Sequence, residues 1–215
     1  MRGENPRMGG FVCTQRNLSP APRSQDRVAV TEQAGGILVA LADGAGGVAG
    51  GEEASWRVVA KAEHALSEGV EPTDAAAWCA LLGTLDGEIE QSNLGGETTG
   101  VILWVDANGI TGASVGDSEA WLVLDDGFED LTGFQRRKPL LGTGEAVPTP
   151  FQARPWSGTI LVASDGLTKY APIEALLAAA RGANLEAAAD RLVDLVRLRS
   201  GALQDDVSLA LVRRA

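Results

Sequence analysis

Two short strands separated by a pair of glycines are the feature that most restricts the fold of this chain. Residues 27–31 (RVAVT) and 37–42 (ILVALA) are predicted to be strands, because apolar and β-branched residues dominate both, and Gly35-Gly36 forms the turn between them. Strands joined by so short a turn pair antiparallel, so the residues flanking the outer ends of the hairpin lie together. Those residues are Asp26 and Asp43. The hairpin therefore predicts two carboxylates at one end of a sheet.

Blocks of strands and pairs of helices alternate along the rest of the chain. Further strands are predicted near 10–14 and at 98–105, 110–115, 120–124, 159–163 and 207–212. Helices are predicted at about 51–67, 172–181 and 185–200, and another is capped by Thr73 or Asp74 and has an apolar stripe that reaches Ile89. Consecutive strands with short connections indicate antiparallel sheets. Two such sheets packed face to face, with a helix pair outside each, would bury every apolar stripe. The expected fold class is α+β, a four-layer α-β-β-α sandwich.

A single domain is expected over residues 1–215, since the chain shows no internal repeat and no convincing boundary. An irregular segment is expected at about 1–9, and many turn-forming residues predict a loop or small irregular lobe over 125–155. The formal net charge of −11 argues against a nucleic-acid partner, because phosphate contacts need clustered Lys and Arg. No apolar segment approaches the length of a membrane span, and the N-terminus has no secretory signal.

Aspartates recur at the ends of the predicted buried strands. Asp43 follows ILVALA, Asp165 follows TILVAS, and Asp205 precedes VSLALV, while Asp117 lies in a fourth turn of this kind. If these ends converge, the carboxylates would repel one another unless divalent cations bind between them. Two ions about 3.5–4 Å apart form a common site for phosphoryl hydrolysis. With oxygen ligands only, Mn²⁺ or Mg²⁺ is expected rather than Zn²⁺. For Asp117 alone, a structural role in capping a turn is as good an interpretation.

Five segments in order resemble the metal-dependent serine/threonine protein phosphatases (PPM, type 2C). They are LADGAGGVAGGEEAS, GETTG, ASVGDSEAWL, LVASDGL and QDDVSLALV, and they fall within about residues 23–212. The resemblance implies a sandwich of two antiparallel sheets, in agreement with the layers inferred above. It also implies hydrolysis of phosphoserine and phosphothreonine by direct attack of a metal-activated water.

The resemblance assigns a role to each acidic position. Asp43 would bridge the two metals, with the Gly44 carbonyl on the second, and Asp165 and Asp205 would complete the first. Asp26 would hold metal-bound waters, and Asp117 corresponds to the acid at a third metal in bacterial relatives. Gln25 stands where some members have a glutamate ligand, and Asp206 stands where asparagine is usual.

The chain also departs from the family pattern. Ala21 occupies the position where the phosphate-binding arginine is expected, which leaves Arg23 or Arg16 as substitutes. Ala45 stands where animal members carry a general-acid histidine, and Glu119 replaces the arginine of GDSR. Residues 137–144, within a possible flap region of about 125–155, are expected to correspond to a mobile flap near the active site.

The implied partner is a phosphoprotein substrate, phosphorylated by a partner serine/threonine kinase, and the implied form is a cytoplasmic monomer that binds neither nucleic acid nor membrane. Two alternatives stay open. The chain could be a catalytically impaired member of the fold that binds a regulatory partner, as Ala45 and Glu119 suggest, or a phosphatase for a small phosphomonoester.

Overall fold

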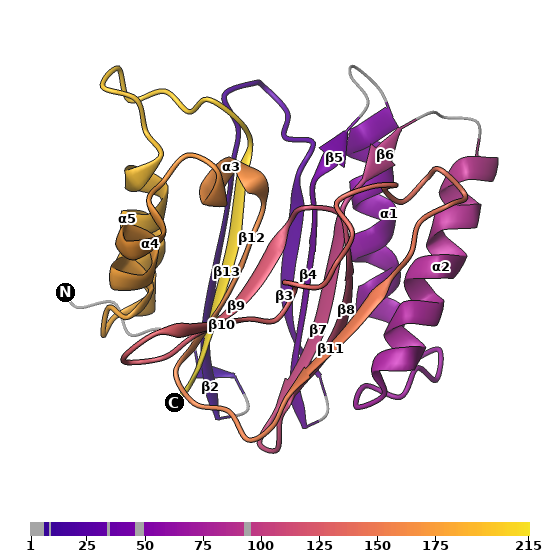
Figure 1. Ribbon diagram of the computed structural model, residues 1–215, viewed down its shortest axis with the longest axis horizontal. Coiled ribbons are helices and arrows are strands. Elements are labelled where there is room, and N and C mark those ends of the chain that lie inside the picture. The colour runs from indigo at the N-terminus through magenta and orange to yellow at the C-terminus, as the bar shows by residue number, and fades with distance from the viewer. Residues whose placement is uncertain (1–6, 9, 34, 46–49, 93–95) are drawn as a thin grey trace.

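Two antiparallel sheets stack face to face and carry helices on both outer faces (Figure 1). The computed structural model describes residues 7–8, 10–33, 35–45, 50–92 and 96–215. Within these residues, no helix is long and apolar enough to cross a membrane. The α+β sandwich predicted from the order of elements is confirmed.

The first sheet has six strands in the order β1-β2-β13-β12-β9-β10. Their bounds are β1 Arg7–Met8, β2 Phe11–Leu18, β13 Val207–Arg214, β12 Thr159–Ala163, β9 Glu119–Val123 and β10 Phe128–Asp130. The second sheet has the order β11-β8-β7-β4-β3. Its strands are β11 Thr149–Ala153, β8 Ile110–Val115, β7 Gly100–Asp106, β4 Gly36–Ala42 and β3 Arg27–Gln33. A small ladder, β5 (Gly44–Ala45) with β6 (Glu97–Thr98), extends beyond the second sheet.

Two helix pairs form the outer layers. The helices α1 (Gly50–His64) and α2 (Ala75–Gln91) cover the five-stranded sheet, and α4 (Ile173–Ala180) and α5 (Leu185–Leu195) cover the six-stranded sheet (Figure 1). Asp74 begins α2 by accepting a hydrogen bond from the Ala76 amide, as expected for an N-cap. A one-turn helix, α3 (Asp165–Thr168), was not predicted.

Three apolar layers hold the sandwich together. One lies between the sheets and includes Val39, Leu103 and Ile160. The other two lie under the helix pairs, one around Trp78 and one around Leu192. Strands in the middle of each sheet are buried on both faces, which explains why ILVALA and TILVA are continuously apolar rather than alternating.

The interpretation of 125–155 as a loop or irregular lobe is wrong in part, because it contains β10 and β11. Pro150 lies within β11, and its missing amide is tolerated because β11 is an edge strand that pairs only with β8. Of the expected irregular segment 1–9, only Arg7–Met8 is described, and these residues form β1. The remainder, like Gly46 and Gly47 of the glycine-rich turn, lies outside the described residues.

Candidate metal centre

Four strand ends bring the predicted carboxylates to one end of the sandwich. The β3–β4 hairpin pairs Arg27 with Ala42, so Asp26 and Asp43 are neighbours, as predicted. In the other sheet, β12 and β13 pair Ala163 with Leu209, which places Asp165 and Asp205 at one end of that pair. In Figure 1 this end is marked by α3 and the β5–β6 ladder.

The Asp26 side chain is fully buried at the start of β3. Neither of its carboxylate oxygens has a hydrogen-bond partner of regular geometry. Burial raises its pKa to about 6, and the charge of Asp206 adds to the shift, while Ser164, Asp43 and Ser208 beside it act in the opposite direction. A buried carboxylate without a partner is costly unless a proton or a cation compensates it.

The Asp43 carboxyl lies at the centre of the cluster. Burial raises its pKa to about 9, with further contributions from the charges of Asp26, Asp165 and Asp205. This mutual effect shows that the four carboxylates lie close enough to repel one another. Their spacing along the chain gives no hint of that proximity, which depends on the stacking of the two sheets.

The Asp43 backbone is held by residues of the GETTG segment. Its carbonyl accepts hydrogen bonds from the Thr98 hydroxyl at 2.9 Å and from the Thr99 amide at 2.9 Å. Its amide donates to the Thr99 hydroxyl oxygen at 2.9 Å, and this hydroxyl also contacts the Ser118 hydroxyl at 2.7 Å. These three buried hydroxyl residues were quoted as part of the family segments but given no role. They lie between or at the ends of strands, where Thr and Ser are common, so the sequence carries no local signal of their role.

Glycines permit close packing of backbones behind the carboxylates. A Cβ at Gly44 would overlap the Gly51 carbonyl at the start of α1 and would lie 2.8 Å from the Gln25 carbonyl oxygen. A Cβ at Gly166 would overlap the carbonyl oxygen of Asp206. The two glycines following Asp43 and Asp165 therefore bring each aspartate against the neighbouring segment.

Asp165 is the first residue of α3, and its carboxylate lies near those of Asp117 and Asp205. Burial raises its pKa, as do the charges of Asp117 and Asp205, while the Lys169 ammonium, 3.5 Å from the Asp165 carboxylate, acts in the opposite direction. A cavity of about 180 Å³ beside it is lined by Asp117, Glu119, Arg137, Asp165, Thr168 and Lys169. Asp117 therefore lies at the border of the cluster.

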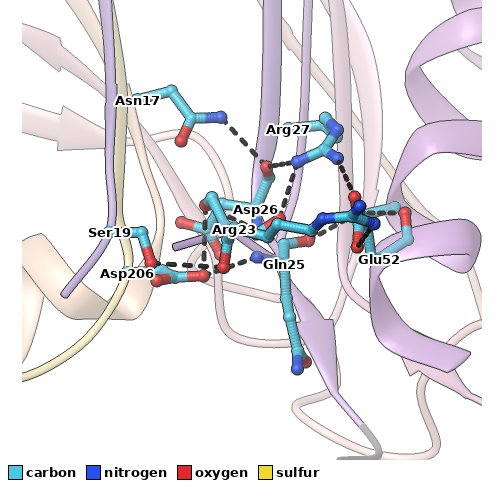
Figure 2. A network of polar contacts seen from close by, with 10 residues as sticks. Asn17, Ser19, Arg23, Gln25, Asp26, Arg27, Glu52 and Asp206 are labelled. Carbon is cyan, nitrogen blue, oxygen red and sulfur yellow. Dashed lines mark hydrogen bonds and ion pairs between the residues drawn. The ribbon is translucent and has the colours of Figure 1, made fainter. Parts of the chain in front are cut away.

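Asp206 anchors the loop that leads into Asp26. Its carboxylate accepts hydrogen bonds from the Gln25 amide at 2.6 Å and from the Ser24 hydroxyl at 3.1 Å (Figure 2). On the other side, Arg27 donates to the carbonyl oxygens of Ser24 and Asp26, each at 2.7 Å, and pairs with Glu52 at 2.9 Å. Arg27 and Glu52 were not singled out in the sequence, because an Arg–Glu pair between a loop and a helix has no local signature.

The two candidate phosphate-binding arginines lie in different places. Arg23 has an 82% exposed side chain, and its guanidinium lies 3.9 Å from Glu52. It lines a groove of about 390 Å³ with Arg27, Glu52, Glu53 and Trp56. Arg16 instead pairs with Glu186 at 2.8 Å and Asp190 at 2.7 Å on α5, on the helix-covered face of the six-stranded sheet. The structure brings Arg23, but not Arg16, beside the Asp26 loop (Figure 2).

The second half of the segment expected to form a flap is bound to the rest of the molecule. Leu141 is fully buried and exchanges two backbone hydrogen bonds with Thr98, each 3.0 Å long. The amides of Gly142 and Gly144 donate to the carboxylate of Asp86 on α2. Mobility of residues 137–144 stays a prediction.

The cluster fits hard divalent cations by the chemistry of its donors, since it offers oxygen atoms only. Within the described part of the chain, no three His, Cys, Asp or Glu side chains converge on one point as a ready-made cage. Mg²⁺ commonly binds through one or two carboxylates and keeps several waters, so such a cage is not required. The raised pKa values of Asp26 and Asp43 and the unpartnered oxygens of Asp26 are what an uncompensated cation site would produce.

Comparison with solved structures identifies the same fold in bacterial phosphatases. The catalytic domain of the serine/threonine protein phosphatase PstP, in complex with two manganese ions, is 25% identical, with a TM-score of 0.81 over 94% of this chain and 97% of that one. The chain has the fold of the PPM serine/threonine phosphatases. The resemblance inferred from the five segments is thus confirmed.

Two further structures give the same result. Stp1 from Staphylococcus aureus is 22% identical, with a TM-score of 0.78 over 99% of both chains. The Mycobacterium tuberculosis phosphatase PstP/Ppp is 25% identical, with a TM-score of 0.78 over 94% of this chain and 98% of that one. No family model matches the sequence, and no curated protein matches it.

Proposed function

We propose that this chain is a metal-dependent serine/threonine protein phosphatase that hydrolyses phosphoserine and phosphothreonine at a two-metal centre. The observation that carries the proposal is the convergence of Asp26, Asp43, Asp165 and Asp205, the first three with raised pKa values, on the fold of known serine/threonine phosphatases. The PstP neighbour contains two manganese ions, which supports the same cofactor here.

Each acidic residue has a role in this proposal. Asp43 would serve as a ligand to both ions, the Gly44 carbonyl would serve the second, and Asp165 and Asp205 would serve the first. Asp26 orients water, and Asp117, at the border of the cluster, is available to a third ion. When bound, Mn²⁺ or Mg²⁺ supplies polarisation of the phosphoryl group and a water of lowered pKa.

Arg23 is the proposed phosphate ligand. Its side chain is exposed, its 3.9 Å contact with Glu52 is long for an ion pair, and its loop is anchored by Asp206 within the cluster. A guanidinium matches the oxygens of a phosphate group and can move to it at little cost from such a contact. The groove beside Arg23, with the 54% exposed Trp56, then receives the substrate chain.

Ala45 supplies no proton to the leaving group, so we propose that water protonates the departing serine or threonine. The physiological substrate is then a phosphoprotein made by an opposing kinase. By analogy with compact bacterial enzymes, we propose a monomeric, cytoplasmic protein and a single domain over residues 1–215.

A phosphatase assay with one variant tests the proposal. The purified chain should hydrolyse p-nitrophenyl phosphate with Mn²⁺ and lose the activity in EDTA, and Asp165→Ala should lower kcat/KM at least about 100-fold. Asp194→Ala, which removes an exposed aspartate on α5, is the matched control and should change nothing. Activity that survives both EDTA and Asp165→Ala would refute a metal mechanism.

A substrate panel separates the alternatives. Phosphoserine and phosphothreonine peptides should be better substrates than sugar phosphates, and the reverse order would favour a phosphatase for small phosphomonoesters. Measurable Mn²⁺ binding without turnover of any phosphopeptide would favour a non-catalytic binding protein.

A further inference from the structure

The strands that carry the acidic cluster at one end carry an arginine cluster at the other. Asp117 precedes β9 and Asp205 precedes β13, whereas Asp165 follows β12. The opposite ends of these strands are Val123 in β9, Thr159 in β12 and Arg214 in β13. A five-residue strand is about 15 Å long, so the two ends are separate sites. In Figure 1 the C-terminus lies at the end of the sheets away from α3 and β5.

The far end holds a cavity of about 360 Å³. Its charged and hydroxyl side chains are Asp125, Ser157, Thr159, Arg181, Arg213 and Arg214. Three guanidinium groups thus face one carboxylate, in a chain whose formal net charge is −11. The volume lies in the range of roughly 300–1,000 Å³ that is typical of small-molecule sites.

The three arginines are fixed by neutral acceptors rather than by acids. Arg213 donates to the Thr159 hydroxyl at 2.6 and 2.9 Å and to the carbonyls of Ala180 and Gly182. Arg181 donates to the Leu124 carbonyl at 2.7 Å and the Gly127 carbonyl at 3.0 Å.

Arg214 donates to the Ala107 carbonyl at 2.8 Å and lies over the Trp156 ring at 4.8 Å. Across the described residues, none of the three arginines forms an ion pair, and the hydrogen bonds leave Nη1 of each unused. The guanidinium groups are therefore held in place, while their positive charge and their Nη1 donors stay available to a ligand.

We propose that this cavity, between the ends of β9, β12 and β13, is a binding site for a small phosphate-bearing anion. Arginine is the side chain best suited to phosphate oxygens, and the hydroxyls of Ser157 and Thr159 add donors. Burial lowers the pKa of Arg213, the charge of Asp125 acts in the opposite direction, and a bound anion would add to the effect of Asp125. This site does not depend on the proposed phosphatase activity.

Two tryptophans make the proposal testable in the full-length, Mg²⁺-loaded protein. The Trp156 indole lies under Arg214 and reports on the cavity, and Trp56 lies beside Arg23 and reports on the groove at the other end. Inorganic phosphate is titrated against sodium chloride of equal ionic strength while the indole N–H signals are followed by NMR, with Trp156→Phe used for assignment. The Trp156 signal should shift saturably with phosphate and not with chloride.

Arg181→Gln removes one guanidinium without touching Trp156, and it should weaken the phosphate response of Trp156 about tenfold or more while leaving that of Trp56 unchanged. Arg197→Gln, at an exposed arginine paired with Asp194, is the matched control and should behave as the wild type. Arg181→Lys, which keeps the charge but loses the planar fork, should give an intermediate affinity.

Phenylphosphonate, whose carbon–phosphorus bond resists hydrolysis, distinguishes the source of the anion. Tighter binding than phosphate would identify an organic phosphate as the ligand, and equal binding would identify free phosphate; either result supports the site. The absence of a saturable Trp156 shift with both probes, or an unchanged response in Arg181→Gln, would overturn the proposal.

Discussion

Asp26 and Asp86 are both buried aspartates, but the hydrogen bonding of their carboxylates is opposite. Asp86, on α2, is 4% exposed and accepts hydrogen bonds from four backbone amides, of Gly142, Thr143, Gly144 and Ala146, at 2.7–3.1 Å. Asp26 is 0% exposed, and its carboxylate oxygens have no partner of regular geometry. Burial alone therefore does not mark a functional carboxylate; the lack of regular hydrogen bonds to its oxygens does.

The comparison separates a structural role from a binding role. The amides around Asp86 tie the segment after Leu141 to α2, so its charge is compensated within the protein. The carboxylate oxygens of Asp26 have no such donors, and the pKa of Asp43 is raised by burial and by the charges of Asp26, Asp165 and Asp205. Removing the Asp86 carboxylate should therefore destabilise the protein, whereas removing a carboxylate of the acidic cluster should reduce repulsion and stabilise the metal-free protein.

The largest effect on stability is expected for Asp86→Ala. Four backbone amides would lose their acceptor, and the free energy of unfolding should fall by about 3–5 kcal/mol. Urea denaturation followed by circular dichroism measures this change. Asp130→Ala is a useful control, because Asp130 also accepts bonds from a backbone amide, that of Thr132, but lies in an exposed edge strand. A loss of unfolding free energy below about 1 kcal/mol for Asp86→Ala would contradict the structural role of this carboxylate.

Metal-free protein should lose stability as the pH rises. The pKa of Asp43 is raised on folding to about 9 and that of Asp26 to about 6, so the folded chain holds protons that the unfolded chain releases near pH 4. The free energy of unfolding should then decrease between about pH 4 and 9, and Mn²⁺ should restore it near neutral pH. Thermal melts across this range, with and without Mn²⁺, test the sign. Stability that rises with pH in EDTA would contradict it.

Asp43→Asn should stabilise the metal-free protein at pH 8. Because the pKa of Asp43 is raised to about 9 on folding, the folded protein must hold this side chain protonated at pH 8, whereas the unfolded chain ionises it. The amide is neutral in both states and removes that cost, so a gain on the order of 1–3 kcal/mol is expected. The same variant should lose the stabilisation that Mn²⁺ gives to the wild type. Denaturation in EDTA and in Mn²⁺ measures both effects, and destabilisation in EDTA would show that Asp43 is compensated by the protein after all.

Asp206→Asn should have the smallest effect. Asp206 lies between the two extremes, since its carboxylate accepts bonds from Ser24 and Gln25 yet its charge raises the pKa of Asp26. Asparagine keeps an acceptor for the Gln25 amide and removes the charge, so the stability should change by less than about 1 kcal/mol. The pH dependence in EDTA should become shallower, and an unchanged slope would show that Asp206 does not act on Asp26.

Much of the fold was predictable from local patterns. The apolar runs and the glycine turn predicted the β3–β4 hairpin, and the order of strands and helix pairs predicted the four layers. The edge strand β11 was missed because Pro150 and the surrounding turn formers resemble a loop, and its position beside β8 is a long-range property.

The sequence by itself determined which residues could form a metal centre, because each aspartate follows or precedes a strand whose apolar pattern is visible. It did not determine which of them meet, which arginine lies beside them, or that Asp86 is compensated. Only the stacking of the two sheets decided that Asp43 and Asp165 share one site, and only the packing of α5 paired Arg16 with Glu186. The physical reason is that strand propensity is a local property, whereas the electrostatic environment of a carboxylate depends on every segment packed around it.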